Sequence, residues 1–497
     1  MIGQCGMIVL TWFWLAVVWL SGWTIASLPV RSQSRQSLSA NERGKLAGHL
    51  ATAFLAGVLA CVLPLYVILA ITGRLTPIAL SAVLGGQLVM ACLGARSLVR
   101  ELRHHAGTMQ NWRGLAGWAL ILGLLASGIP FWGYDAQAIY GLKAKILADG
   151  LSIYGPDFMD PYRVHYWNNY PLLVPLLEAQ AFFWRNQWAV LTGQELWNDL
   201  GMPVILWGFI VALVLQVAAT TERHWPGCGP WMGLVFAITP MLWRWTEGAG
   251  LSGSVDIVFA SLVLSAVIQL SQLAEAAQLQ WGPLVRGGLF LTAACLTKQE
   301  GAIATGAILG AFVATTVWKL WRGRESLGSL VGRRVILSGV RCLLLVGLLV
   351  LPTFVFLRAV HGPMPAPPYS RPYLAAFNFD WLSRIGDRPL TVGAFAVNEF
   401  FNNRWGLLWL LGVFGLFLPR SRPIDAATMF CRAYFLLVLA AYLGIFVVTP
   451  YPLQFHLHTA FARLMFHIFP VFVIVTIEQI ASLPWRRPAL PAEPVAG

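Results

Sequence analysis

A few charged side chains interrupt the apolar segments of this 497-residue chain at places where they could carry chemistry. Asp135 follows an aromatic stretch at the end of one apolar segment, and Asp256 lies about one turn into another. Lys298 and Glu300 break the chain between two further segments, and Arg463 opens the last one. An acid in apolar surroundings can accept a proton from a hydroxyl group, whereas the arginine fork suits a phosphate. These residue types indicate acid–base chemistry beside a phosphorylated group.

Each of these residues also has a purely structural interpretation. Asp135 could cap a helix over 136–149, and Asp256 could be an acid that the helix dipole favours in a first turn. Lys298 and Glu300 could form a surface salt bridge, and Arg463 could extend its head group to a membrane surface. At the level of the sequence, both interpretations stay open.

The elements that must position these residues are membrane spans. Hydrophobic residues make up 58% of the chain and charged residues only 11%, against ~25% charged residues in an ordinary globular protein. So few charges exclude a set of soluble domains, and so much apolar mass excludes a disordered chain. The seven cysteines form no CxxC pair, so disulfides and zinc sites are not expected. The composition predicts an all-α polytopic membrane protein.

Apolar stretches of 17–25 residues are typical of spanning helices, and the sequence predicts about thirteen in one domain over 1–483. Two long polar segments, 131–198 and 358–404, are expected as outer loops, and 171–191 as an amphipathic helix within the first. Residues 484–497, rich in Pro and Ala, are expected to be a disordered cytoplasmic tail. The predicted spans are 7–29, 46–71, 76–99, 114–131, 200–220, 229–245, 251–273, 284–297, 301–318, 335–357, 405–419, 433–449 and 462–482.

The distribution of charge predicts the orientation in the membrane. No Lys or Arg precedes the first span, whereas Arg31, Arg35, Arg43 and Lys45 follow it, so the N-terminus is expected outside and the segment to be an anchor. Alternation from this start places 21 of the 34 Lys and Arg inside. The net charge of +13 then collects on the inner face and reports topology, so no nucleic-acid partner is expected.

Four motifs in a fixed order resemble those of a known superfamily. They are W-x-x-D-A at 132–136, Y-P-L-L-x-P-L-L-E-A at 170–179, T-K-x-E-G at 297–301 and H-x-x-x-x-R at 458–463. With the acid at 256, this set resembles bacterial GT-C integral-membrane glycosyltransferases of the protein-mannosyltransferase and aminoarabinose-transferase superfamily. The resemblance covers roughly residues 130–470. It implies transfer of a sugar, with inversion, from a polyprenyl-phosphate donor to a glycan, lipid or protein hydroxyl on the extracytoplasmic face of the inner membrane.

The resemblance also assigns roles to residues. It makes Asp135 the catalytic base, and it maps a middle acid to Asp256 and the K-x-E-G motif to Lys298 and Glu300. Where most members with an acidic pair read Asp-Glu, this chain reads Asp135-Ala136, so no paired-acid motif supports a divalent metal and metal dependence is left open. Cations would stabilise the leaving lipid phosphate. The candidates are Lys298, Arg463 and His458 for that phosphate, Glu247 for the supporting polar site, and Trp132, Tyr134, Trp167, Asn169 and Tyr170 for sugar contacts.

Three other functions remain as alternatives. A polymerase or ligase of surface polysaccharide would also span the membrane many times, but would use Arg and His in one large outer loop and need no early acid. A transporter would place charges at the middle of the bilayer, whereas these candidates lie near one surface. The third alternative is a structural membrane subunit. The early position of Asp135 favours the glycosyltransferase.

Overall fold

The computed structural model describes residues 2–27, 42–105, 110–131, 133–159, 170–243, 250–252, 254–276, 279–323, 330–361, 385–418 and 423–483. Every regular element in these ranges is a helix. Nine of the described helices are long and apolar enough to cross a membrane. They are α1 (Ile2–Ala26), α2 (Glu42–Thr72), α3 (Pro77–His105), α8 (Val204–His224), α11 (Asp256–Glu275), α13 (Gly301–Gly323), α14 (Leu330–His361), α18 (Ala426–Val448) and α19 (Leu453–Ala481).

The other four predicted spans correspond to shorter helices. A span needs about 20 residues, whereas α4 (Arg113–Ser127) has 15 and α12 (Trp281–Thr297) has 17. The chain over 229–245 is divided into α9 (Gly229–Ala237) and α10 (Pro240–Trp243), and the chain over 405–419 holds only the ten residues of α17 (Leu408–Phe417). A multi-pass helical membrane protein is therefore confirmed, and the count of thirteen stays a prediction.

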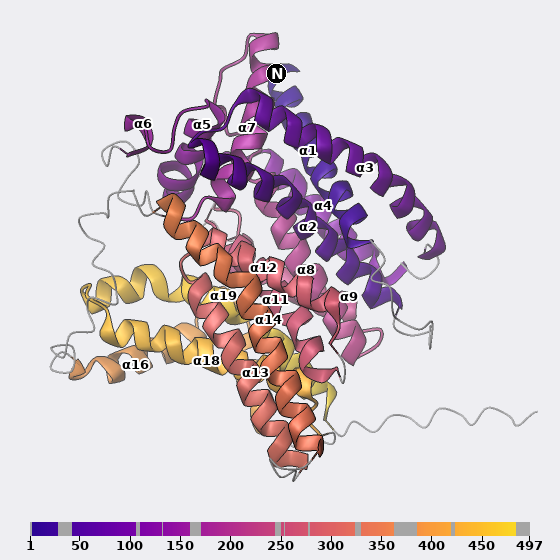
Figure 1. Cartoon of the computed structure of the whole chain (residues 1–497), viewed down its shortest axis with the longest axis vertical. Helices are drawn as coiled ribbons and strands as arrows, with labels where there is room; N and C mark the ends of the chain where they lie inside the picture. Colours follow the sequence, from indigo (N-terminus) through magenta and orange to yellow (C-terminus); the bar gives the residue numbers. More distant parts are fainter. Residues whose placement is uncertain are drawn as a thin grey trace, which may run out of the picture.

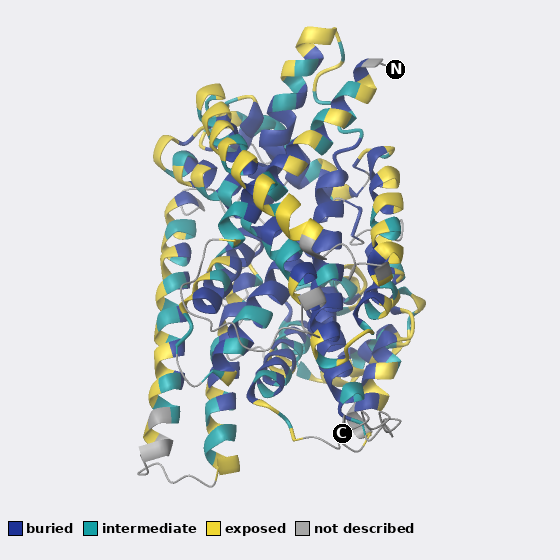
Figure 2. Cartoon of the chain, turned by 90° about the vertical axis from the view of Figure 1, so that its right-hand side faces the viewer, coloured by how far each residue is buried: buried dark blue, intermediate teal, exposed yellow. Residues whose placement is uncertain are grey.

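Helices α8, α11 and α19 form the centre of the bundle, and α14 lies at its rim. In the most apolar stretch of α8, 94% of the residues are buried, against 22% in α14. Figure 2 shows the buried helices in dark blue between helices that expose one side. The exposed side of α14 carries Leu344, Leu348 and Leu351 at helical spacing. Such an apolar outer surface fits contact with lipid rather than with water.

The N-terminal helices lie in the upper part of Figure 1, with α13 and α18 in the lower part, and the end of α14 reaches the N-terminal helices. Helix α1 packs on α2 and α3, and α2 packs on the central α8. Helix α11 in turn contacts α12 and α19. About half of the second predicted outer loop, residues 362–384, lies outside the described residues, and its end forms α16 (Arg388–Phe400) and the 3-10 turn η5 (Asn403–Trp405).

The described residues of the predicted first outer loop contain four helices. The chain forms a π-helical turn, η3 (Asp135–Gly141), followed by α5 (Leu142–Ala148), α6 (Pro156–Met159) and α7 (Leu173–Thr192). The expectation of an amphipathic helix over 171–191 was wrong for its first half, because residues 171–183 are all buried. The reason is tertiary: α7 packs against α1, α2 and α5 together, so it has no open face there.

Two glycines allow α1 and α2 to touch through their backbones. A Cβ atom added at Gly22 would lie 1.8 Å from the carbonyl oxygen of Ala53, and one added at Gly57 would lie 1.8 Å from that of Val18. Small residues at such crossings let helices in a membrane approach closely. No other residue type fits either position without separating the two helices.

We expect Gly57→Ala to destabilise the protein by about 1–3 kcal/mol, as overpacking in a closed interior does. The matched control is Gly306→Ala in α13, where an added Cβ would meet nothing within 4 Å. Detergent-induced unfolding of the two purified variants measures the difference. Equal stability of the two variants would show that the α1–α2 crossing separates at little cost.

Candidate functional site

The side chain of Asp256 is the centre of a cluster of charged residues. It is the first residue of α11 and is fully buried. Its Oδ1 accepts hydrogen bonds from Lys298 Nζ at 2.6 Å and His467 Nε2 at 2.8 Å, and its Oδ2 accepts one from Arg463 Nε at 2.8 Å. The hydroxyl of Ser254 also donates to Oδ2. A buried carboxylate is costly unless it is paired and hydrogen-bonded, and here four donors satisfy it.

The helices bring these donors together through simple geometry. Asp256 begins α11, and Lys298 directly follows the end of the neighbouring α12, where the backbone turns extended. Helices α11 and α12 follow one another in the chain and pack side by side, so the start of one meets the end of the other. Arg463 and His467 are four residues apart on α19 and therefore lie on the same face of that helix.

Asp135 joins the cluster from the first loop. Its Oδ2 accepts a hydrogen bond from Arg463 Nη2 at 2.6 Å, so one guanidinium connects Asp135 to Asp256. The Asp135 side chain is 15% exposed and that of Arg463 is 24% exposed. The acid is the first residue of the π-helical turn η3, and Tyr134 rather than Asp135 occupies the capping position before it. Arg463 thus connects the loop, α11 and α19.

Glu300 forms a second partner for Lys298 on the more open side. The distance from Lys298 Nζ to Glu300 Oε1 is 3.4 Å, and the Glu300 side chain is 25% exposed. Burial acts to raise the pKa of Glu300, but the charge of Lys298 and smaller local contributions together hold the pKa below its usual range. The break between α12 and α13 is tight, because a Cβ at Gly301 would lie 2.5 Å from the Cα of Cys295. The ion pair is therefore fixed at a rigid corner.

His467 closes the buried end of the cluster. Its Nε2 faces the carboxylate of Asp256, which accepts a hydrogen bond, and its Nδ1 lies 3.1 Å from the hydroxyl of Tyr442. A proton on Nε2 and a lone pair on Nδ1 satisfy both contacts, with the tyrosine donating. The ring also packs against Phe259, with centroids 4.5 Å apart. This end of the cluster serves to orient Asp256.

The cluster therefore has a closed end and an open end. Asp256 and His467 are sealed, whereas Asp135, Arg463 and Glu300 are partly exposed. An ionised carboxylate at Asp135 can accept a proton from a hydroxyl group, and the guanidinium of Arg463 can contact an anion with the N–H groups that the two carboxylates leave unused. The arrangement can combine a base with a cation at the same surface.

His458 does not belong to this cluster, contrary to its expected role at a phosphate. Its side chain is exposed, its Nδ1 lies 2.8 Å from the carbonyl oxygen of Gln454, and its ring packs against Phe395. Helix α19 begins at Leu453 rather than at the expected 462. Five residues along a helix turn the side chain by roughly 140°, so His458 and Arg463 point in different directions.

The aromatic candidates are only partly described. Tyr134 is 54% exposed beside Asp135, and Tyr170 stacks on Tyr140 with ring centroids 6.5 Å apart. The other candidates for contacts or support lie outside the described residues: Trp132, Trp167, Asn169 and Glu247.

Sequence reasoning gave no role to Ser254, Tyr442 or His467. The spacing of four residues between Arg463 and His467 is a signal that could have identified the histidine. Ser254 precedes Asp256 by two residues, which is a common spacing for a local hydroxyl–carboxylate contact. Tyr442 lies on α18, and nothing in its own neighbourhood of the sequence points to this site.

No cluster of three or more His, Cys, Asp or Glu side chains in the described ranges is arranged to hold a metal ion. Both oxygens of Asp256 already accept hydrogen bonds from Lys298, His467 or Arg463. Metal dependence of the site remains open.

Lys143 lies on α5, within the first loop, close to two aromatic rings. Its side chain is fully buried, with Nζ 5.8 Å from the ring centre of Phe158 and 6.0 Å from that of Tyr170. Burial lowers the pKa of Lys143 from 10.5 to about 7. Between pH 7 and 10.5 the unfolded chain then binds more protons than the folded one, so the contribution of Lys143 to stability rises with pH in this window.

We expect Lys143→Met to be more stable than the wild type at pH 7 and to lose this pH dependence. The measurement is the free energy of unfolding in detergent at several values between pH 7 and 10. Lys145→Met on the same helix is the control and should keep the wild-type slope. If Lys143→Met kept the slope as well, the pKa of Lys143 would not be lowered in the folded protein.

The chain was compared with known proteins at three levels. Comparison with protein families, with curated proteins and with solved structures gives no match at any of the three levels.

Proposed function

We propose that the chain is a membrane glycosyltransferase that moves a sugar from a polyprenyl-phosphate donor to a hydroxyl acceptor at the membrane surface where the charged cluster opens. The observation that carries this proposal is the double bridge of Arg463, which joins the partly exposed Asp135 to the buried Asp256. It places a carboxylate and a guanidinium within 2.6 Å of one another. The reaction requires a base and a cation at adjacent positions.

Asp135 is the base in this proposal. A sugar or protein hydroxyl is a weak nucleophile, so a carboxylate must take its proton as it attacks the anomeric carbon. The described residues make no hydrogen bond to Asp135 Oδ1, which can therefore accept that proton while Oδ2 stays bound to Arg463. The bridge to Arg463 fixes the orientation of the carboxylate before the acceptor arrives.

Arg463 is the first cation to meet the leaving phosphate. Its guanidinium uses Nε and one N–H of Nη2 for carboxylates and keeps three further N–H donors. Lys298 is more deeply buried and is held by Asp256 and Glu300. It acts through the local field on the developing negative charge rather than by direct contact. Tyr134, which is exposed beside Asp135, offers its ring to the sugar.

In this proposal the protein lies in the inner membrane, which it crosses about thirteen times. Its N-terminus lies outside, and the charged cluster lies on the extracytoplasmic face. A cysteine placed at the exposed Gln299 in a cysteine-free background should react with an impermeant maleimide on intact cells. A cysteine at the exposed Arg103 should react only after permeabilisation. The reverse pattern would place the cluster inside and exclude an extracytoplasmic reaction.

A transfer assay tests the reaction. Purified protein in liposomes is incubated with a panel of radiolabelled polyprenyl-phosphate sugars and a membrane extract as acceptor source, with protein-free liposomes as the control. The expected result is protein-dependent consumption of one donor and appearance of label in the acceptor fraction. If well-folded protein consumed no donor in the presence of acceptor, the glycosyltransferase proposal would fail in favour of the polymerase, ligase or transporter.

A further inference from the structure

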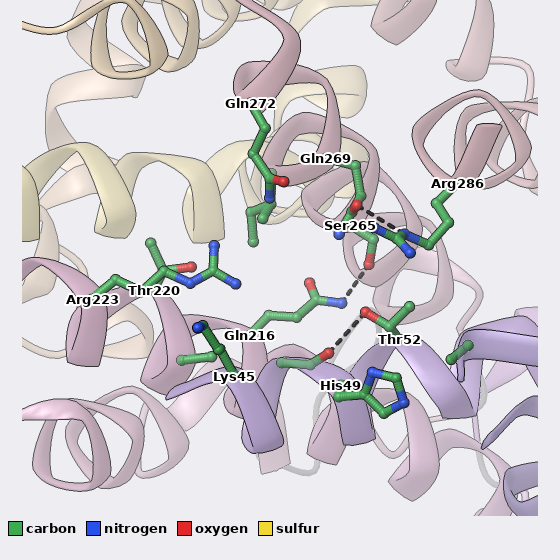
Figure 3. A pocket seen from close by; sticks show the side chains of 14 residues that line it. Lys45, His49, Thr52, Gln216, Thr220, Arg223, Ser265, Gln269, Gln272 and Arg286 are labelled. Atoms are coloured by element: carbon green, nitrogen blue, oxygen red, sulfur yellow. Dashed lines mark hydrogen bonds between the residues drawn. The ribbon is translucent and has the colours of Figure 1, made fainter. Parts of the chain in front are cut away.

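A second polar site lies at the other end of the helices that hold the charged cluster. A cavity of about 500 Å³ opens between the ends of α1, α2, α8, α11 and α12 (Figure 3). Ser265, which lines it, is nine residues beyond Asp256 on α11, and Arg286, which also lines it, is twelve residues before Lys298. These separations correspond to about 14 and 18 Å along the two helices. The cavity is therefore distinct from the charged cluster.

The lining of the cavity is basic. Lys45 of α2, Arg223 of α8 and Arg286 of α12 contribute three cations, and no carboxylate lines it. Figure 3 shows Lys45 and Arg223 on one side and Arg286 with Gln269 on the other. In the described part of the chain, no carboxylate forms an ion pair with any of the three cations. Three like charges around one cavity favour an anionic occupant.

Gln216 adds a requirement that a bare anion does not meet. It is 5% exposed and lines the cavity. Its Nε2 donates to the hydroxyl oxygen of Ser265, which itself donates to the carbonyl oxygen of Ser261. This chain of donors fixes the amide orientation and leaves Gln216 Oε1 buried without a partner among the described residues. A buried acceptor of this kind needs a donor, such as a hydroxyl group.

The remaining polar groups support the same ligand. Arg286 Nε donates to Gln269 Oε1 at 3.1 Å, which holds the guanidinium at the cavity wall. Gln272 and Thr220 add further polar side chains. The volume is in the range of known small-molecule sites, ~300–1,000 Å³. The cavity therefore provides cations for a phosphate and an acceptor for a hydroxyl group.

We propose that this cavity binds a phosphate ester that carries a free hydroxyl group. The phosphate lies between Arg223, Lys45 and Arg286, and the hydroxyl donates to Gln216 Oε1. The cavity lies at the ends of spanning helices, where either a lipid head group or a soluble ester can reach it. The site does not depend on the transfer reaction proposed for the charged cluster.

Binding measurements on the purified full-length protein in phosphate-free detergent test the proposal. Glycerol 3-phosphate represents the soluble source, and short-chain phosphatidylglycerol in mixed micelles represents the lipid source, with phosphatidylcholine as the reference. We expect the wild type to bind at least one of the two phosphoglycerol probes, and the probe that binds identifies the source. Binding of neither probe would overturn the proposal.

Variants then locate the site. Arg223→Gln with Arg286→Gln should weaken binding at least tenfold, whereas the exposed pair Arg96→Gln with Arg100→Gln on α3 removes the same charge and should leave it within twofold. Equal losses in the two pairs would show that only general charge attracts the probe and would overturn the site.

Gln216→Leu should weaken glycerol 3-phosphate binding about tenfold but leave the binding of inorganic phosphate unaffected. An equal effect of Gln216→Leu on both probes would contradict the proposed contact between Gln216 and the ligand hydroxyl group. If the double variant does not fold, binding of the same probes by Lys45→Gln, at an exposed residue, and by Gln216→Leu is compared with binding by the wild type.

Discussion

Replacement of Asp256 by alanine is expected to destabilise the protein by about 3–5 kcal/mol, the range observed when one partner of a buried ion pair is removed. The carboxylate is fully buried and holds Lys298, Arg463 and His467 at 2.6–2.8 Å. Without it, Lys298 keeps only Glu300 and Arg463 keeps only Asp135 as ion-pair partners among the residues that the structure describes. The buried part of the cluster would then contain positive charge with no local compensation.

Detergent-induced unfolding of purified Asp256→Ala measures this effect. Ser261→Ala on the same helix is a suitable control, because its hydroxyl is buried but neutral and donates only to carbonyl oxygens. We expect a loss of about 1 kcal/mol for the control, the usual contribution of a neutral hydrogen bond. A second variant, Asp256→Ala with Lys298→Met, should recover part of the stability because it removes one uncompensated cation. Similar unfolding of Asp256→Ala and Ser261→Ala would show that the cluster contributes little to stability.

Replacement of Asp135 by asparagine is expected to lower sugar transfer by about 10²–10⁴-fold, the usual contribution of a general base. The same change should leave the fold nearly unaffected. Asp135 is partly exposed, and Arg463 retains its contact with Asp256 through Nε when the charge of Asp135 is lost. The two carboxylates bound to one guanidinium should thus separate into one that supports the structure and one that supports the reaction.

The matched control for this prediction is Asp149→Asn. Asp149 is an exposed acid that directly follows α5, in the same loop as Asp135. Transfer by Asp149→Asn should equal that of the wild type, and both variants should elute from size-exclusion chromatography as the wild type does. Wild-type transfer by Asp135→Asn would remove Asp135 as the base. If Asp135→Asn lost both transfer and folding, Asp135 would instead have a structural role through its contact with Arg463.

The sequence predicted the grouping of the charged cluster well. Asp135, Asp256, Lys298, Glu300 and Arg463 were expected at one surface because each lies at the same end of an alternating span, and the structure brings all five together. The residues of the basic cavity lie at the opposite span ends in the same alternation. Sidedness follows from chain order and span length alone, so it can be read without knowing how the helices pack.

Sequence reasoning failed where packing decides the outcome. Helix α19 begins nine residues earlier than predicted, directly after Pro452, and α18 begins seven residues earlier, where the side chain of Asp425 accepts a hydrogen bond from the Thr428 N–H. The earlier start of α19 places His458 within the helix, five residues before Arg463 and on a different face, whereas His467 shares the face of Arg463. Hydropathy detects the apolar part of a spanning helix, but it gives little information on the polar turns by which the helix extends beyond that part.

The sequence by itself determined a polytopic helical membrane protein and the residue types that could act in its charged cluster. Only the tertiary structure decided that one arginine joins Asp135 to Asp256, that His467 and Tyr442 orient the buried carboxylate, and that the first half of α7 is buried on all sides. The physical reason is that composition and alternation depend on the transfer of each segment into the bilayer, which is a local property. Which side chains meet depends on the rotation and crossing of helices far apart in the chain, such as α11 and α19, and no local pattern records that.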